Sequence, residues 1–123
     1  MTYQSVTYET NRPTLPFASE SLPEITLDAL NPSDHLLIKT VNSTYCFMVV
    51  DPSRGLGLLT GGVLGSTAVE TVFLGAQILH PSGMASCLLS KLREGAQAIF
   101  FLVAGDPVEQ LVTSTIIKLV HRH

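Results

Sequence analysis

Hydrophobic and polar residues follow a short, strand-like pattern along most of the chain after residue 23. The apolar runs are rich in Val, Ile, Leu, Phe, Tyr and Thr and end at Gly, Pro, Asp or Asn, as β-strands commonly do. The pattern predicts six strands, at residues 36–41, 43–51, 57–62, 68–79, 96–103 and 110–121. Gly75 interrupts the fourth strand, which favours a bulge or a sharp bend at that point.

The segments between these strands predict two short helical turns and several loops. One turn is expected at residues 27–30, and a second at the start of residues 88–103, where Gly95 ends it. The segment "HPSGMASC" (80–87) is expected to be a loop. Because almost no amphipathic helix is present, we predict an all-β, single-domain fold, a small β-barrel of about six strands or a compressed sandwich.

The first 23 residues differ in pattern from the rest of the chain. They are polar, show no sustained period and contain Pro13, Pro16 and Pro23. We therefore expect an extended N-terminal arm over residues 1–23 and the β-barrel domain over residues 24–123.

The second predicted strand is apolar on both of its faces. Alternate residues of a strand point to opposite sides of a sheet. The two faces are Tyr45/Phe47/Val49 and Thr44/Cys46/Met48/Val50. A strand that is buried on both sides, or on one side and at an interface, has this composition.

Composition adds an expectation about partners. Of the 123 residues, 46% are hydrophobic and only 14% are charged, so apolar surface is expected to be hidden in a homo-oligomer or against a protein partner. The net charge is −3 and the seven Lys and Arg residues are scattered, which disfavours nucleic acid and an acidic membrane surface. With no signal peptide or membrane-spanning run, and with only Cys46 and Cys87, we expect a cytoplasmic chain with reduced cysteines.

A glycine-rich segment, Asp51–Gly62, is the main candidate for ligand binding. Neither GxGxxG nor a P-loop Gly-Lys-Ser/Thr is present, and strands flank the segment on both sides. We interpret the glycines as turn and bulge residues. The alternative is a small-ligand site for a nucleotide or another anion, made of Asp51, Ser53, Arg54, Gly55, Gly57, Thr60, Gly61 and Gly62.

Within this segment, "DPSRGLGLL" (51–59) resembles the Asp/Asn-x-Ser-x-x-Gly motif of PilZ domains, β-barrels that bind cyclic di-GMP. Asp51 and Ser53 fit the motif, whereas Leu56 stands at its glycine position. The family's upstream Arg-x-x-x-Arg pair is missing, since Arg12 is the sole arginine before the barrel. The resemblance implies a distantly PilZ-like nucleotide sensor as an alternative function.

The motifs for catalysis and for metal binding are weaker. Cys87 and His80 lie seven residues apart and form the basis of a third hypothesis, a cysteine-dependent enzyme. His121 and His123 can share a strand face and hold a metal with a third ligand, but their place at the end of the sequence favours fraying into solvent. The leading hypothesis is a non-enzymatic module that acts through self-association or protein binding, with no metal or cofactor.

Overall fold

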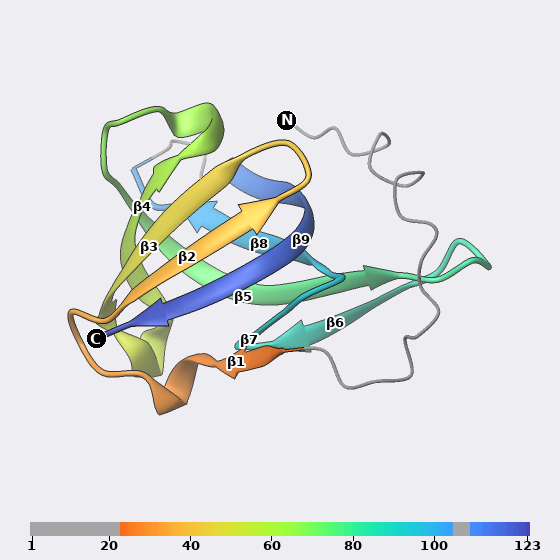
Figure 1. Ribbon diagram of the computed structural model, residues 1–123, viewed down its shortest axis with the longest axis horizontal. Coiled ribbons are helices and arrows are strands. Elements are labelled where there is room, and N and C mark those ends of the chain that lie inside the picture. The colour runs from red at the N-terminus through yellow and green to blue at the C-terminus, as the bar shows by residue number, and fades with distance from the viewer. Residues whose placement is uncertain (1–22, 105–108) are drawn as a thin grey trace.

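The computed structural model describes residues 23–104 and 109–123. Over these residues the chain is mostly β, as the sequence predicted, with short 3-10 turns as its helical elements (Figure 1). The strands are β1 Glu24–Thr26, β2 His35–Thr40, β3 Thr44–Asp51, β4 Leu56–Gly61, β5 Val69–Leu79, β6 Ala85–Leu89, β7 Lys91–Arg93, β8 Gln97–Leu102 and β9 Glu109–Arg122. The turns are η2 Leu27–Ala29, η3 Pro52–Arg54 and η4 Gly62–Leu64. The N-terminal arm expected at residues 1–23 lies outside the described residues except for Pro23.

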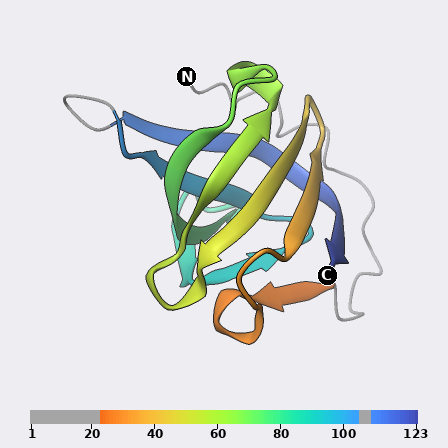
Figure 2. The same cartoon turned by 90° about the vertical axis from the view of Figure 1, so that its left-hand side faces the viewer.

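Antiparallel pairing joins seven of these strands into one sheet. Their order is β4-β3-β2-β9-β8-β5-β6, and β4 also pairs with β5. The hydrogen-bonded neighbours therefore lead from β4 through five other strands and back to β4, and the strands curve around a common interior (Figure 2). Strands β1 and β7 form a separate two-stranded sheet.

The long strand β5 changes partners part-way along one edge. Residues 69–72 pair with β4, and residues 75–79 pair with β6. Between these two stretches the register with β8 shifts, at Phe73/Gly75. A Cβ at position 75 would collide with the carbonyl oxygen of Leu88, so glycine allows β6 to approach closely. The irregularity predicted at Gly75 is confirmed.

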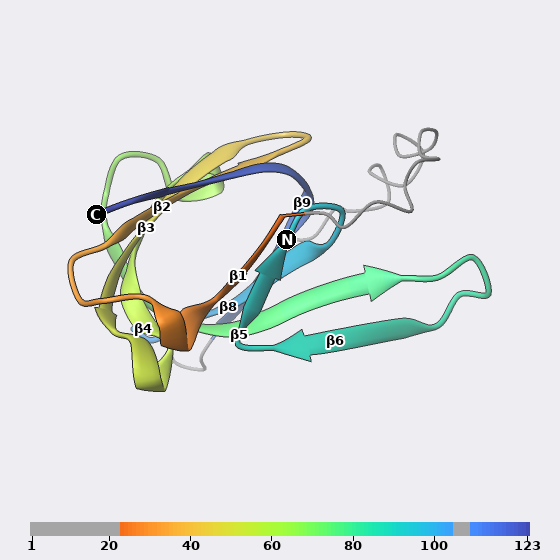
Figure 3. The ribbon, with the colours of Figure 1, turned by 60° about the horizontal axis from the view of Figure 1, so that its bottom comes forward.

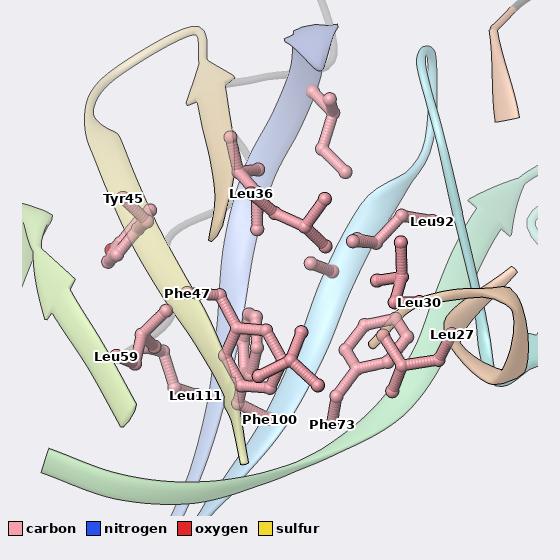
Figure 4. Close-up of a cluster of buried hydrophobic side chains, with 14 residues drawn as sticks. Leu27, Leu30, Leu36, Tyr45, Phe47, Leu59, Phe73, Leu92, Phe100 and Leu111 are labelled. Carbon is pink, nitrogen blue, oxygen red and sulfur yellow. The ribbon is translucent and has the colours of Figure 1, made fainter. Parts of the chain in front are cut away.

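The core fills the space that the curved sheet encloses. In β3 the alternation predicted from sequence places Tyr45, Phe47 and Val49 inward, all at most 3% exposed. The ring of Phe100 lies 5.5 Å from that of Phe47 and 5.3 Å from that of Phe73, between centroids. These aromatic rings and the surrounding aliphatic side chains, with Leu27 and Leu30 added from the first turn, form one cluster (Figure 4).

The structure corrects two sequence predictions. The expected loop at 80–87 includes the start of β6, and the helical turn expected from residue 88 is replaced by β6, Ser90 and β7. Ser90 has a left-handed φ of 61° and bends the chain between the two strands. Two leucines three residues apart would share one face of a helix. Here Leu89 is 65% exposed and Leu92 is 1% exposed, so this spacing does not reflect a helix.

Within the described residues, no helix is long and apolar enough to cross a membrane.

Candidate functional site

A two-stranded arm projects from the rest of the molecule (Figure 3); it is made of β5 beyond Gln77, the turn at residues 80–84 and β6. The pairing of β5 with β6 and β8 explains why the arm projects. Gln77 lies opposite Gln97, the first residue of β8, and also opposite Cys87 in β6. Residues 78 and 79 therefore extend past the end of β8 and pair with β6 alone among the described strands.

The outer edge of β6 carries backbone groups that pair with no strand among the described residues. At one end of the hairpin, His80 N–H donates to the Met84 carbonyl oxygen at 2.9 Å. At the other end, Ser90 N–H donates to the Leu74 carbonyl oxygen, also at 2.9 Å. Since antiparallel bonding alternates, the even-numbered residues from 84 to 90 face β5 and the odd-numbered ones face away. In the described part of the chain no strand pairs with this outer edge, which presents the N–H and C=O groups of Ala85, Cys87 and Leu89.

Several large apolar side chains of the arm are exposed to solvent. Leu79 is 40% exposed, Leu89 65% and Met84 68%. Strand β6, with the sequence Ala-Ser-Cys-Leu-Leu, has no charged residue and no proline, which are the usual means of preventing an edge strand from pairing. Among the strands that the structure describes, the outer edge of β6 is thus free to accept another strand.

A cleft of about 510 Å³ lies between the arm and the body of the molecule. Two of its polar side chains, Gln77 and Gln97, hydrogen-bond to other groups of the protein. The Gln97 amide donates to the Thr113 carbonyl oxygen at 3.1 Å and accepts from the Gln77 amide at 3.2 Å. We therefore interpret the cleft as a result of the contacts that attach the arm to the body of the molecule.

The geometry of the arm does not bring Cys87 to His80. His80 Nε2 lies 2.7 Å from Ser86 Oγ. Because successive residues of a strand point to opposite faces, the Cys87 thiol and the Ser86 hydroxyl lie on opposite sides of β6. Cys87 is exposed. The cysteine-dependent enzyme stays a prediction without geometric support.

The glycine-rich segment is divided between two ends of a strand. Asp51 to Gly55 form one turn before β4, whereas Gly61 is the last residue of β4 and Gly62 follows it. Gly61 lies six residues of extended chain after Gly55, a distance of roughly 20 Å. The eight candidate ligand residues therefore do not surround one position, and three of them, Gly57, Thr60 and Gly61, belong to β4 itself.

Interactions within the first turn account for its polar residues and its glycine. The Ser53 hydroxyl donates to Asp51 Oδ1 at 2.8 Å, and Arg54 Nε lies 3.6 Å from Asp51 Oδ2. Gly55 has a left-handed φ of 71°, and a Cβ there would lie 2.7 Å from the Phe73 carbonyl oxygen. At Gly57 a Cβ would meet the Phe47 ring at 2.5 Å. Turn formation and close packing thus explain this segment, and the nucleotide site stays a prediction.

A third group of side chains gathers where β2 begins and β9 ends. Leu36 lies opposite His121, and His35 lies opposite Arg122. If this register is extended by one residue beyond the two strands, Asp34 falls opposite His123. Asp34 is held in line because its carbonyl oxygen accepts from Val49 N–H of β3 at 2.9 Å.

Because side chains alternate along a strand, His121 and His123 point to the same side, where both reach the Asp34 carboxylate. His121 Nε2 lies 2.9 Å from Asp34 Oδ2, and His123 Nδ1 lies 3.8 Å from Asp34 Oδ1. The Asp34 side chain is 6% exposed. A backbone hydrogen bond from Asn31 and a hydrogen bond to His121 hold the pKa of Asp34 below its ordinary value, although burial opposes this shift.

The prediction that both histidines fray into solvent is wrong for His121. Strand β9 continues to Arg122, and the His121 side chain is only 29% exposed. The shared face of the two histidines followed from their spacing. Their contact with Asp34 could not be predicted from the spacing, because only the pairing of β2 with β9 brings residue 34 next to residues 121 and 123.

Searches with the chain against protein-family models, curated proteins and solved structures find no match.

Proposed function

We propose that the chain is a non-enzymatic assembly module that forms a homodimer through the projecting β5–β6 arm. The observation that supports this proposal is the uncharged outer edge of β6, with which no strand in residues 23–104 and 109–123 pairs. A sheet edge of this kind binds another strand through backbone hydrogen bonds.

We also infer that six of the strands close into a small barrel from which the arm projects. The cycle of pairings from β4 through β3, β2, β9, β8 and β5 back to β4 supports closure. A closed barrel has no free edges of its own. The outer edge of β6 is then the place for strand addition on the larger sheet.

The edge is complementary to itself. An antiparallel pair of β6 strands related by a two-fold axis can be centred on Cys87, with Ala85 of one chain opposite Leu89 of the other. All three of these residues direct their backbone groups outward, so every pair exchanges hydrogen bonds. No charge on β6 opposes a second copy. A two-fold interface of this type uses the same surface twice, as homodimers commonly do.

The apolar side chains of the arm would add to this interface. Leu89 and Met84 are the most exposed large hydrophobic residues of the arm. The low charge fraction of the whole chain is consistent with apolar surface being covered in an assembly. Because five-residue strands bury little area compared with the roughly 1,200–2,000 Å² of stable complexes, we expect a dimer that dissociates on dilution.

Light scattering over a wide range of protein concentration tests the proposal. The wild-type mass is expected to rise from monomer to dimer. Cys87→Lys places two like charges opposite each other at the centre of the interface and should keep the protein monomeric. Ser66→Lys adds the same charge to an exposed turn and serves as the control.

The native cysteines provide an independent readout. In the proposed register the two Cys87 Cα atoms lie about 5.5 Å apart, within the range that a disulfide can bridge. Mild oxidation should therefore link two chains, and Cys87→Ser but not Cys46→Ser should abolish the link. A monomer at every concentration, or a dimer that Cys87→Lys leaves intact, would contradict the proposal.

A further inference from the structure

We propose that Asp34, His121 and His123 form a binding site for a divalent transition-metal ion, with zinc the best match to the donor atoms. The site lies at the junction of β2 and β9, remote in sequence from the arm, and its function does not depend on dimerisation through β6. The three residues are the candidate ligands.

The donor set is the one that zinc and similar ions use. Two imidazole nitrogens and one carboxylate oxygen occupy three positions and leave the remainder to water or another ligand. One ligand atom from each of the three residues lies within 4.8 Å of the others. Ligands of a tetrahedral zinc ion, each about 2.0–2.2 Å from the metal, lie roughly 3.4 Å apart, so a separation as long as 4.8 Å has to shorten by about 1 Å when the ion binds.

The side chain best able to make that adjustment is also the most exposed. The His123 side chain is 79% exposed, whereas Asp34 is fixed by its backbone bond to β3 and by Asn31 N–H, which donates to Oδ2 at 3.0 Å. His121 Nε2 lies 2.9 Å from the same oxygen, and an ion bound by this nitrogen would replace the proton that it donates to Asp34, with release of that proton to solvent. Asp34 and His121 are therefore already adjacent, and His123 can close on the ion.

The second oxygen of Asp34 points independently to a cation. Within residues 23–104 and 109–123, both hydrogen bonds to this carboxylate end on Oδ2. Oδ1 belongs to a side chain that is 6% exposed, and its neighbour His123 Nδ1 is 3.8 Å away, beyond hydrogen-bonding distance. A buried carboxylate oxygen without a donor is costly. An ion between Oδ1 and the imidazoles would satisfy it.

Isothermal titration of the metal-free full chain with zinc chloride tests this assignment. We expect saturable binding of one ion per chain. Since the loss of an outer-shell partner alone weakens metal sites by roughly 10–100-fold, removing a ligand in His123→Ala should weaken binding by at least that factor. His123 is exposed, so this variant should keep its fold, which circular dichroism checks.

His35→Ala is the matched control. His35 is exposed, lies next to Asp34 in sequence and points to the opposite face of β2, so its removal should leave zinc affinity unchanged. Asp34→Asn should weaken binding as His123→Ala does. The proposal is overturned if the folded wild type binds no zinc, or if His123→Ala and Asp34→Asn bind it as tightly as wild type.

Discussion

At the scale of single residues, Asp34 connects local hydrogen bonding to the stability of the whole molecule. The Asn31 backbone bond and then the His121 contact lower the pKa of Asp34 in the folded state below 3.8, its ordinary value. The unfolded chain therefore takes up a proton at a higher pH than the folded one. The stabilisation that Asp34 contributes is present above about pH 4 and is lost as the pH falls through the lowered pKa.

This linkage predicts how an Asp34→Asn variant behaves with pH. At neutral pH the variant should unfold at a lower urea concentration than wild type, because it lacks the charged acceptor. As the pH falls below 3.8, the two unfolding midpoints should converge, since wild-type Asp34 becomes neutral as well. A difference that stays constant from pH 7 to pH 3 would show that the charge of Asp34 is not the cause.

At the scale of elements, the junction at Gly75 decides whether the arm stays attached to the sheet. Gly75→Ala sets a methyl group against the backbone of Leu88 and Leu89. We expect a loss of about 1–3 kcal/mol in the free energy of unfolding, as for other overpacked sites. Hydrogen exchange should also become faster at the Ser86 and Leu88 amides, whose bonds to β5 depend on that contact. Unchanged protection at these amides would contradict this account.

The elements also show what the sequence could and could not reveal. Strand β3 was predictable because its burial depends on its own alternation, Tyr45, Phe47 and Val49 facing the core. Strands β6 and β7 were not, because the left-handed Ser90 that separates them has no signal comparable to glycine. Likewise the spacing of His121 and His123 predicted a shared face, but Asp34 joins them only through the register of β2 and β9.

At the scale of the whole molecule, one aromatic cluster links strands that are distant along the chain. Phe100 of β8 contacts Phe47 of β3 on one side and Phe73 of β5 on the other. It is fully buried, with an exposure of 0%. A side chain in this position ties opposite walls of the curved sheet together, so its loss should affect all of the described strands at once.

Phe100→Ala should therefore lower the free energy of unfolding by about 3–5 kcal/mol, a large part of the roughly 5–15 kcal/mol that holds a domain of this size together. Phe101→Ala is the matched control, because Phe101 is the next residue of β8, points to the other face and is only partly buried. Urea unfolding followed by both fluorescence and far-ultraviolet circular dichroism measures the difference. If the walls share one core, the two probes should give the same lowered midpoint for Phe100→Ala. Separate midpoints would mean that the parts of the sheet unfold independently, and equal losses for both variants would mean that Phe100 does not link them.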